Sequence, residues 1–187
     1  MSKIYILKRL DLNQVSIFLI LLNRVKYNNK REVDMHYSSV QVVFQEVPNE
    51  ISLAISISGC QLKCIGCHSA FTWDDTYGKP LTLKILSDLI NKYKGYITCL
   101  IFYGGEWELD TLISFLNLAI NHHLKTCLYT GLEISNFDSQ FLKSLSYIKT
   151  GRYNQQLGGL NSINTNQKFY KLSYGNIIED LTTSFTQ

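Results

Sequence analysis

The chain has 187 residues, of which 45% are hydrophobic and 18% are charged. This composition suits one folded domain with an apolar core, and it excludes general disorder. The net charge of +3 divides unevenly, because residues 1–34 hold seven basic and three acidic residues while residues 35–187 hold eleven and twelve. Since the larger part is close to neutral, we expect no nucleic-acid partner.

Residues 1–34 are predicted to be an N-terminal extension, and residues 35–187 to be the functional domain. The apolar run Val15–Leu22 has eight residues, whereas a membrane-spanning helix needs about 20. No small-residue cleavage site follows the run, so a secretory signal is not indicated. We therefore expect a cytoplasmic protein without a membrane anchor. A further hypothesis is that translation starts at Met35, since every recognisable element follows it.

From residue 40 onward, strand-like and helix-like runs alternate. In chain order, the pattern predicts strands over 40–47 and 51–58, a helix over 82–93, a strand over 96–103, a helix over 109–122, a strand over 124–130, a helix over 138–145 and a strand over 147–150. Such alternation is typical of an α/β fold with mostly parallel strands. Loops after the carboxyl ends of parallel strands carry ligands. We expect the loops after residues 58, 103 and 130 to meet at one edge of the sheet.

Three of the five cysteines fall within eight residues, as Cys60, Cys64 and Cys67 in the spacing C-x3-C-x2-C. Thiolates suit zinc or an iron–sulfur cluster. Three thiolates without an obvious fourth ligand favour a four-iron four-sulfur cluster that keeps one iron open. A zinc site, or no metal at all, is the alternative interpretation. Cys99 and Cys127 lie within apolar strands and are expected in the core.

Two further loops carry candidate binding residues. Gly104, Gly105 and Glu106 follow a predicted buried strand, where glycines allow the backbone to approach a ligand closely. The alternative is an ordinary turn, with the carboxylate favouring the start of the next helix. Thr130 and Gly131 end the next strand and either contact the ligand or only form a turn.

The residues after the last predicted strand leave two interpretations open. Lys149, Arg152 and Tyr153 face either the mouth of an active site or a protein partner. The segment 158–167 is rich in glycine and asparagine, so it is predicted to be a loop. It either docks a partner or is simply solvated.

The stretch ISGCQLKCIGCHSAFTW (57–73) resembles the radical S-adenosylmethionine superfamily, and within it the activating proteins of anaerobic ribonucleoside-triphosphate reductase. His68 after the third cysteine carries the narrower resemblance, together with Thr72-Trp73 and the stretch IKTGRYNQQLGGLNSINTNQKFY (148–170). The resemblance spans about residues 37–173.

The sequence departs from the superfamily pattern at two positions. Gly66 stands where an aromatic residue usually precedes the third cysteine, so that His68 takes over part of that role. Trp107 replaces the proline of the usual GGEP motif, which changes the stiffness of the turn.

The resemblance implies a partial, open βα barrel. The length agrees, because a complete barrel needs about 250 residues and 153 follow from Met35 onward. It also implies that the three clustered cysteines hold a 4Fe-4S cluster with one iron not ligated by protein. The residues implied to bind S-adenosylmethionine are Gly66, Cys67, His68, Gly104, Gly105, Glu106 and Thr130.

The activity implied by the resemblance is that of a radical oxidoreductase. A flavodoxin- or ferredoxin-like protein donates one electron, S-adenosylmethionine is cleaved to methionine and a 5′-deoxyadenosyl radical, and that radical takes a hydrogen atom from a glycine of the reductase. The cofactors carry this chemistry, so no side-chain acid or base is needed. One alternative is an enzyme that activates another glycyl-radical enzyme or modifies a small molecule. An alternative from another class is a non-catalytic iron–sulfur or zinc-binding protein.

Overall fold

The computed structural model describes residues 35–186, so the expectations for residues 1–34 lie outside the described residues. In chain order, the strands are β1 (His36–Val43), β2 (Ser52–Ile57), β3 (Lys79–Pro80), β4 (Cys99–Tyr103), β5 (Lys125–Tyr129), β6 (Tyr147–Thr150), β7 (Lys168–Ser173) and β8 (Asn176–Asp180). The α-helices are α2 (Leu83–Lys92), α3 (Leu109–Asn121) and α4 (Ser139–Leu142). Short 3-10 helices are η1 (Ala70–Trp73), η2 (Glu106–Glu108), η3 (Ile134–Asn136) and η4 (Thr182–Phe185).

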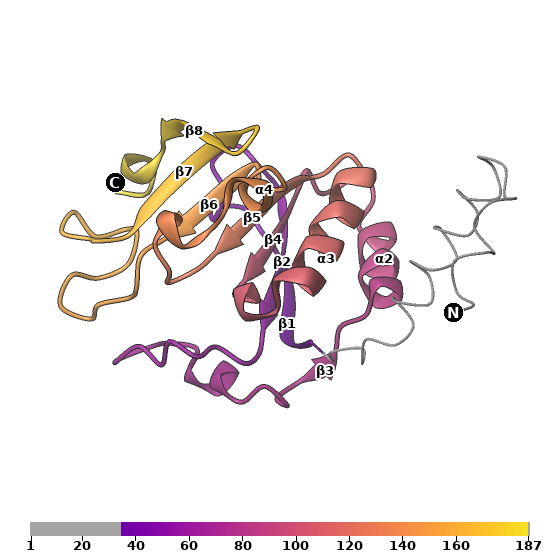
Figure 1. The fold of residues 1–187 in the computed structure, drawn as a ribbon, viewed down its shortest axis with the longest axis horizontal. Helices are drawn as coiled ribbons and strands as arrows, with labels where there is room; N and C mark the ends of the chain where they lie inside the picture. The colour runs from indigo at the N-terminus through magenta and orange to yellow at the C-terminus, as the bar shows by residue number, and fades with distance from the viewer. Residues whose placement is uncertain (1–34, 187) are drawn as a thin grey trace, which may run out of the picture. The chain divides into compact units, whose positions relative to one another are not determined.

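The eight strands form one mixed sheet in the order β3-β1-β2-β4-β5-β6-β7-β8 (Figure 1). The central strands β2, β4, β5 and β6 pair in parallel, as their alternation with helices predicts. The flanking strands pair antiparallel. Two residues join β7 to β8 and eight join β1 to β2, whereas a parallel crossover needs about a dozen or more. The α/β class is confirmed, but the expected parallel pairing is confined to the centre, and the sheet is open and is not a barrel.

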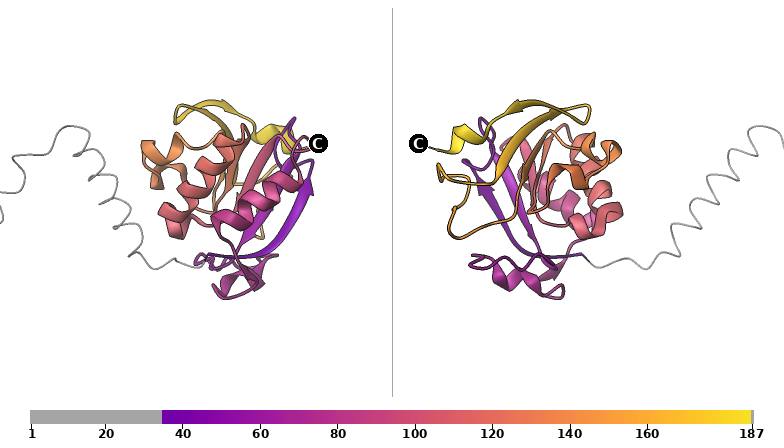
Figure 2. Two further views of the ribbon diagram at one scale, coloured as in Figure 1. Left: turned by 90° about the vertical axis from the view of Figure 1, so that its right-hand side faces the viewer. Right: turned by 60° about the vertical axis from the view of Figure 1, so that its left-hand side comes forward.

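Helices α2 and α3 cover one face of the sheet (Figure 2). Thr82 begins α2 as predicted, because its side-chain oxygen accepts a hydrogen bond from the backbone N–H of Ile85 at 3.2 Å. The apolar stripes of the two helices, including Leu86 and Leu116, are buried with Phe102 of β4 in the main core. Among the described residues, no helix has the length and apolar character that crossing a membrane requires.

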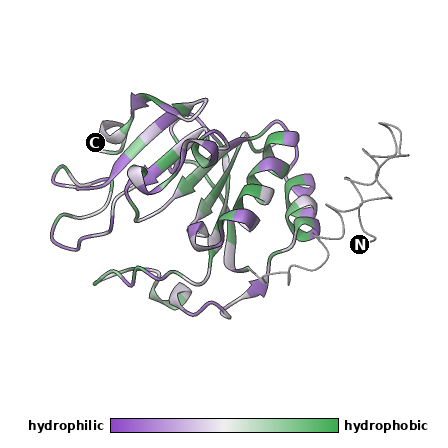
Figure 3. Cartoon of the chain, in the orientation of Figure 1, coloured by the Kyte–Doolittle hydropathy of each residue, from purple (hydrophilic) through white to green (hydrophobic). Residues whose placement is uncertain are grey.

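The opposite face of the sheet carries a second apolar cluster. Its buried members are Val47, Ala54, Cys99, Ile101, Cys127, Tyr147 and Phe169. Alternate residues of one strand point to opposite faces, so β4 supplies apolar residues to both clusters, and the centre of the sheet is largely hydrophobic (Figure 3). β5 begins with the polar residues Lys125 and Thr126 before it becomes apolar. Cys99 and Cys127 are completely buried, which confirms their expected place in the core.

The cysteine loop, residues 59–78, is fastened to β1 at both ends. On one side, the backbone N–H of Ser58 donates to the carbonyl of His36 at 2.9 Å. On the other side, the N–H of Leu81 donates to the carbonyl of Met35 at 2.6 Å, and β3 pairs with β1. The loop therefore leaves the sheet and returns to it at one place.

Candidate active site

The loops after β2, β4 and β5 meet at one edge of the sheet, as the sequence predicts. These strands are adjacent and parallel, so their carboxyl ends lie at the same edge. A Cβ atom added to Gly131 would lie 2.4 Å from Leu62, so the loop after β5 touches the cysteine loop. The loop after β6 joins them, because the Arg152 guanidinium donates a hydrogen bond to the Leu62 carbonyl.

The three predicted cluster ligands lie on the cysteine loop. Cys64 is buried, Cys60 and Cys67 are half-buried, and all three are free thiols. The backbone N–H of Cys67 donates to the carbonyl of Cys64 at 3.1 Å, and the N–H of Ser69 donates to the Cys67 sulfur at 3.4 Å. Across residues 35–186, no three His, Cys, Asp or Glu side chains are grouped as metal ligands, so the thiols share a loop without converging.

Trp107 bridges the cysteine loop and the loop after β4. A Cβ atom at Gly104 would lie 2.6 Å from the Trp107 ring, and a Cβ atom at Gly59 would lie 2.9 Å from its Nε1 atom. Both glycines also have positive φ angles, +83° and +104°, which favour glycine. The indole therefore occupies the space that these two glycines leave beside Cys60 and Glu106.

Glu106 has one satisfied and one free carboxylate oxygen. Thr130 donates from Oγ1 to Oε1 of Glu106 at 2.6 Å and accepts from the N–H of Leu132 at 3.0 Å. The Oε2 atom of Glu106 is buried without a hydrogen-bond partner. Burial raises the pKa of Glu106, and the bond from Thr130 opposes that rise. A buried acceptor without a donor is unusual in a folded protein, and a ligand that donates hydrogen bonds would satisfy it.

Lys149 lies beside this pair on β6. Its Nζ atom donates to the Gly151 carbonyl at 3.0 Å and to the Thr130 carbonyl at 3.4 Å. Only 8% of the residue is exposed. Burial lowers the pKa of Lys149 to about 8, and the nearby Cys64 and Glu106 groups oppose that shift. The structure thus places the Lys149 amine beside Thr130, the residue that also contacts Glu106.

The loop after β6 packs over the cysteine loop with several side chains. The rings of His68 and Tyr153 lie 5.6 Å apart. A Cβ atom at Gly66 would lie 2.7 Å from the side-chain oxygen of Gln155. Gly66 and His68 thus face this second loop, and the described residues around them do not place them against Glu106.

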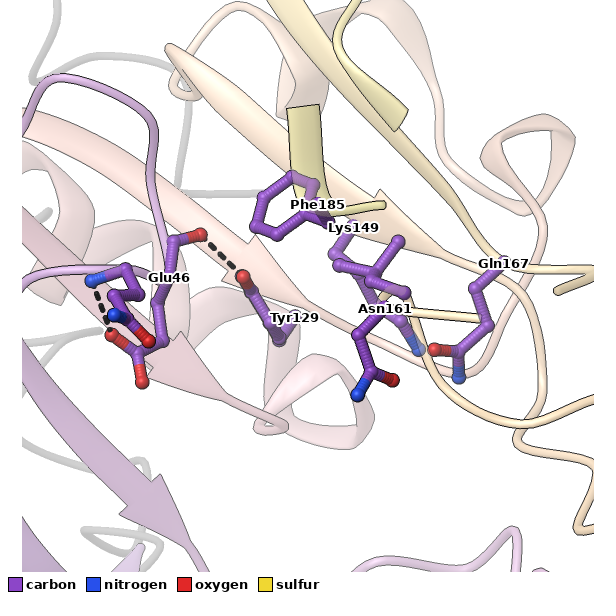
Figure 4. A pocket seen from close by; sticks show the side chains of 8 residues that line it. Glu46, Tyr129, Lys149, Asn161, Gln167 and Phe185 are labelled. Carbon is purple, nitrogen blue, oxygen red and sulfur yellow. Dashed lines mark hydrogen bonds between the residues drawn. The ribbon is translucent and has the colours of Figure 1, made fainter. Parts of the chain in front are cut away.

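A pocket of about 340 Å³ opens on the face of the sheet opposite α2 and α3 (Figure 4). It is lined by Gln45, Glu46, Tyr129, Lys149, Leu160, Asn161, Gln167 and Phe185. Tyr129 donates a hydrogen bond to the backbone carbonyl of Glu46. Leu160, Asn161 and Gln167 belong to the predicted 158–167 loop, which is irregular as expected. The sequence analysis did not identify Tyr129. A signal was present, because side chains two residues apart in a strand share a face, so Tyr129 lies on the same face as the buried Cys127.

The description "4Fe-4S single cluster domain" names the protein family that matches residues 51–171, more than half of the chain. The chain belongs to this family. The match starts just before the first residue of β2 and ends within β7, so it contains the cysteine loop, Glu106, Thr130 and Lys149.

A relative agrees with this family assignment and with the resemblance seen in the sequence. It is an anaerobic ribonucleoside-triphosphate reductase-activating protein of enterobacteria phage T4, 25% identical over 114 residues. The alignment covers 56% of this chain and 72% of the relative. No solved structure matches the chain.

The residues of the cysteine loop fit the 4Fe-4S cluster that the family implies. Three free thiols supply the soft ligands that iron–sulfur clusters take. Burial raises the pKa of Cys60, backbone N–H groups of the loop oppose the rise, and the charge of Glu106 adds to it. A thiolate at Cys60 is therefore better stabilised with a bound cation than alone.

Proposed function

We propose that this protein cleaves S-adenosylmethionine reductively and generates a glycyl radical on an anaerobic ribonucleoside-triphosphate reductase. The observation that carries the proposal is the buried, unpartnered Oε2 atom of Glu106. It lies on the loop that Trp107 connects to the three-cysteine loop. A carboxylate with a free acceptor suits the ammonium group of an amino-acid ligand.

Cys60, Cys64 and Cys67 are proposed to hold the 4Fe-4S cluster and to leave one iron open. When bound, such a cluster supplies the electron for cleavage of the sulfonium. The family assignment supports the cluster, and the presence of only three thiols on the loop supports the open iron. A flavodoxin- or ferredoxin-like protein is the proposed electron donor.

The remaining binding roles fall to residues at the same sheet edge. We propose that Glu106 accepts from the ammonium group and that Thr130 holds its carboxylate in place through the 2.6 Å hydrogen bond. Gly104 and Gly105 let the backbone approach the ligand, since both have positive φ angles. His68, next to Tyr153, is proposed to flank the adenine.

A reductase partner is supported by the activating protein of phage T4 that resembles this chain. In this proposal, a loop of the partner approaches the edge of the open sheet where the loops after β2, β4 and β5 meet. The alternative, a different radical enzyme, predicts the same cleavage with another acceptor of the radical.

The proposal is tested by anaerobic reconstitution with iron and sulfide, followed by reduction and addition of S-adenosylmethionine. We expect 5′-deoxyadenosine and methionine in equal amounts, and a glycyl radical signal in electron paramagnetic resonance when the reductase is present. Cys64→Ala should lose both, because one of three thiolates is missing. Cys127→Ala is the matched control, since this thiol is buried in the core away from the loop.

The outcomes separate the interpretations. No 5′-deoxyadenosine from a reduced, cluster-loaded protein would reject the proposed chemistry and favour a non-catalytic protein. Deoxyadenosine without a glycyl radical on the reductase would reject only the partner.

A further inference from the structure

Two isoleucines on the loops of the candidate active site are almost fully exposed. Ile65 lies between Cys64 and Cys67 on the cysteine loop and is 84% exposed, while Ile163 lies in the loop after β6 and is 89% exposed. They are the most exposed aliphatic side chains among residues 35–186. A single exposed apolar residue needs no explanation. Two of them at one edge of the sheet indicate a surface that another protein covers.

The loops that carry the two isoleucines are in direct contact. The rings of His68 and Tyr153 lie 5.6 Å apart, one from each loop. Residues 59–73 and residues 151–167 therefore form one continuous surface, which we call the two-loop surface. It lies at the edge where the proposed function places the approach of the reductase.

Hydrogen bonds within the loop after β6 hold the region around Ile163 in shape. The backbone N–H of Thr165 donates to the carbonyl of Ser162 at 3.1 Å. The Asn166 amide donates to the carbonyl of Arg152 at 3.0 Å, which ties the end of the loop to its start. A loop that is ordered before binding loses less conformational entropy when a partner docks. Ile163 is thus presented to solvent on a pre-organised turn.

The basic side chains of the two-loop surface are not balanced by carboxylates. Lys63 and Arg152 are exposed, and neither segment of the surface contains Asp or Glu. Neither cation forms an ion pair with another residue of the described part of the chain. Asp74, the next carboxylate along the cysteine loop, accepts hydrogen bonds from Thr76 instead. A complementary partner surface therefore carries carboxylates beside an apolar patch.

We infer that the two-loop surface docks the reductase at an apolar patch flanked by carboxylates, with Ile163 as the anchor that enters the patch. This inference rests on the proposed function, to which it adds the contact residue and the chemistry of the partner surface. Ile163 acts in recognition of the protein partner and takes no part in the cleavage of S-adenosylmethionine.

The test measures the dissociation constant of the complex between the reductase and full-length, cluster-loaded protein under anaerobic conditions. Ile163→Asp removes the apolar anchor and repels the carboxylates of the partner, so it should weaken binding by at least about tenfold. A higher concentration of the reductase should restore the yield of glycyl radical. Formation of 5′-deoxyadenosine without the reductase should equal that of the wild type.

Two variants and one change of conditions make the result specific. Ile163→Leu keeps an apolar anchor and should bind like the wild type. Ile178→Asp places the same charge at an exposed isoleucine of the edge strand β8, and it should also bind like the wild type. Raising the salt concentration from about 50 to 300 mM should weaken wild-type binding, because salt screens Lys63 and Arg152 from the carboxylates of the partner.

Wild-type affinity in folded Ile163→Asp, or equal weakening by Ile178→Asp, would overturn the inference and leave the proposed function intact. Wild-type binding that does not respond to salt would also overturn it. Wild-type protein that forms 5′-deoxyadenosine but does not bind the reductase would overturn the proposed partner together with the inference. Binding that depends on Ile163, without any 5′-deoxyadenosine, would overturn the proposed chemistry and support the docking surface.

Discussion

The burial of Glu106, which the proposed binding role requires, has a cost to the folded state. Because burial raises its pKa, the ionised carboxylate is less favourable in the folded protein than in the unfolded chain. The stability that the neutral form contributes is complete below the unfolded pKa, near 4.5, and is lost as the pH rises through the folded value. A site that must present a free carboxylate oxygen is therefore destabilising when no ligand is bound.

This reasoning gives a prediction for the protein without cofactors. Glu106→Gln replaces the ionisable carboxyl group by a neutral amide. The free energy of unfolding of this variant should therefore increase relative to that of the wild type as the pH rises from about 4 to 7. Denaturant unfolding at a series of pH values measures the difference. Thr130→Val removes the hydrogen bond that lowers the pKa of Glu106. In this variant, the loss of stability should therefore occur at a higher pH than in the wild type. Parallel curves for wild type and Glu106→Gln would contradict the assignment.

At the scale of elements, Trp107 holds two loops together. Its ring contacts the loop backbone at Gly59 and Gly104, and it packs on the main core. Trp107→Ala should lower the stability by about 2–3 kcal/mol, less than for a fully buried aromatic residue, and should speed amide hydrogen exchange over residues 59–62. Trp107→Phe keeps a ring against both glycines and serves as the control. Unchanged exchange in the alanine variant would show that other contacts hold the cysteine loop.

The strands and helices differ in how clearly the sequence pattern predicts them. Each predicted strand and helix overlaps an observed one, because buried parallel strands and amphipathic helices have strong apolar patterns. The bounds differ most at the strand predicted over 40–47, which is observed as β1 over His36–Val43, and at the helix predicted over 138–145, which is observed as α4 over Ser139–Leu142. The strands β7 and β8 were missed. Every residue of β8 is exposed, so it has no buried face to leave a pattern. β3 has only two residues and exists because β1 lies beside it.

The residues of the candidate site also divide into those that a local sequence pattern predicts and those that only the fold brings together. Cys60 and Glu106 could be proposed from the sequence because they belong to local motifs. The burial of Lys149 and the bond from Arg152 to the Leu62 carbonyl depend on strands and loops that are distant in sequence. No local pattern encodes such contacts, since they follow from the order of strands in the sheet.

Across the whole molecule, the five cysteines divide into an edge group and a core group. Burial raises the pKa of Cys99 to about 12 and that of Cys127 well above its ordinary value, so both stay protonated and unreactive at neutral pH. In protein without a cluster at pH 8, a thiol reagent should modify Cys60 and Cys67 first. Cys99 and Cys127 should react only at the rate of global unfolding.

Mass spectrometry of peptides after timed labelling measures this order. Addition of denaturant is the control, because it should make all five thiols react alike. Rapid modification of Cys127 in the native protein would contradict the position of the second apolar cluster.

The fastening of residues 59–78 to β1 has a consequence for ligand uptake. Bringing the ends of a chain segment together costs conformational entropy, and this cost grows only slowly with the length of the segment. The cost arises once, when the ends are joined. Here the hydrogen bonds to the carbonyls of Met35 and His36 close the segment as the sheet forms. When a cluster brings the three thiols together, it therefore has to reduce only the conformational entropy that remains inside the closed segment. Folding of the sheet thus lowers the entropic barrier to metal assembly before any iron arrives.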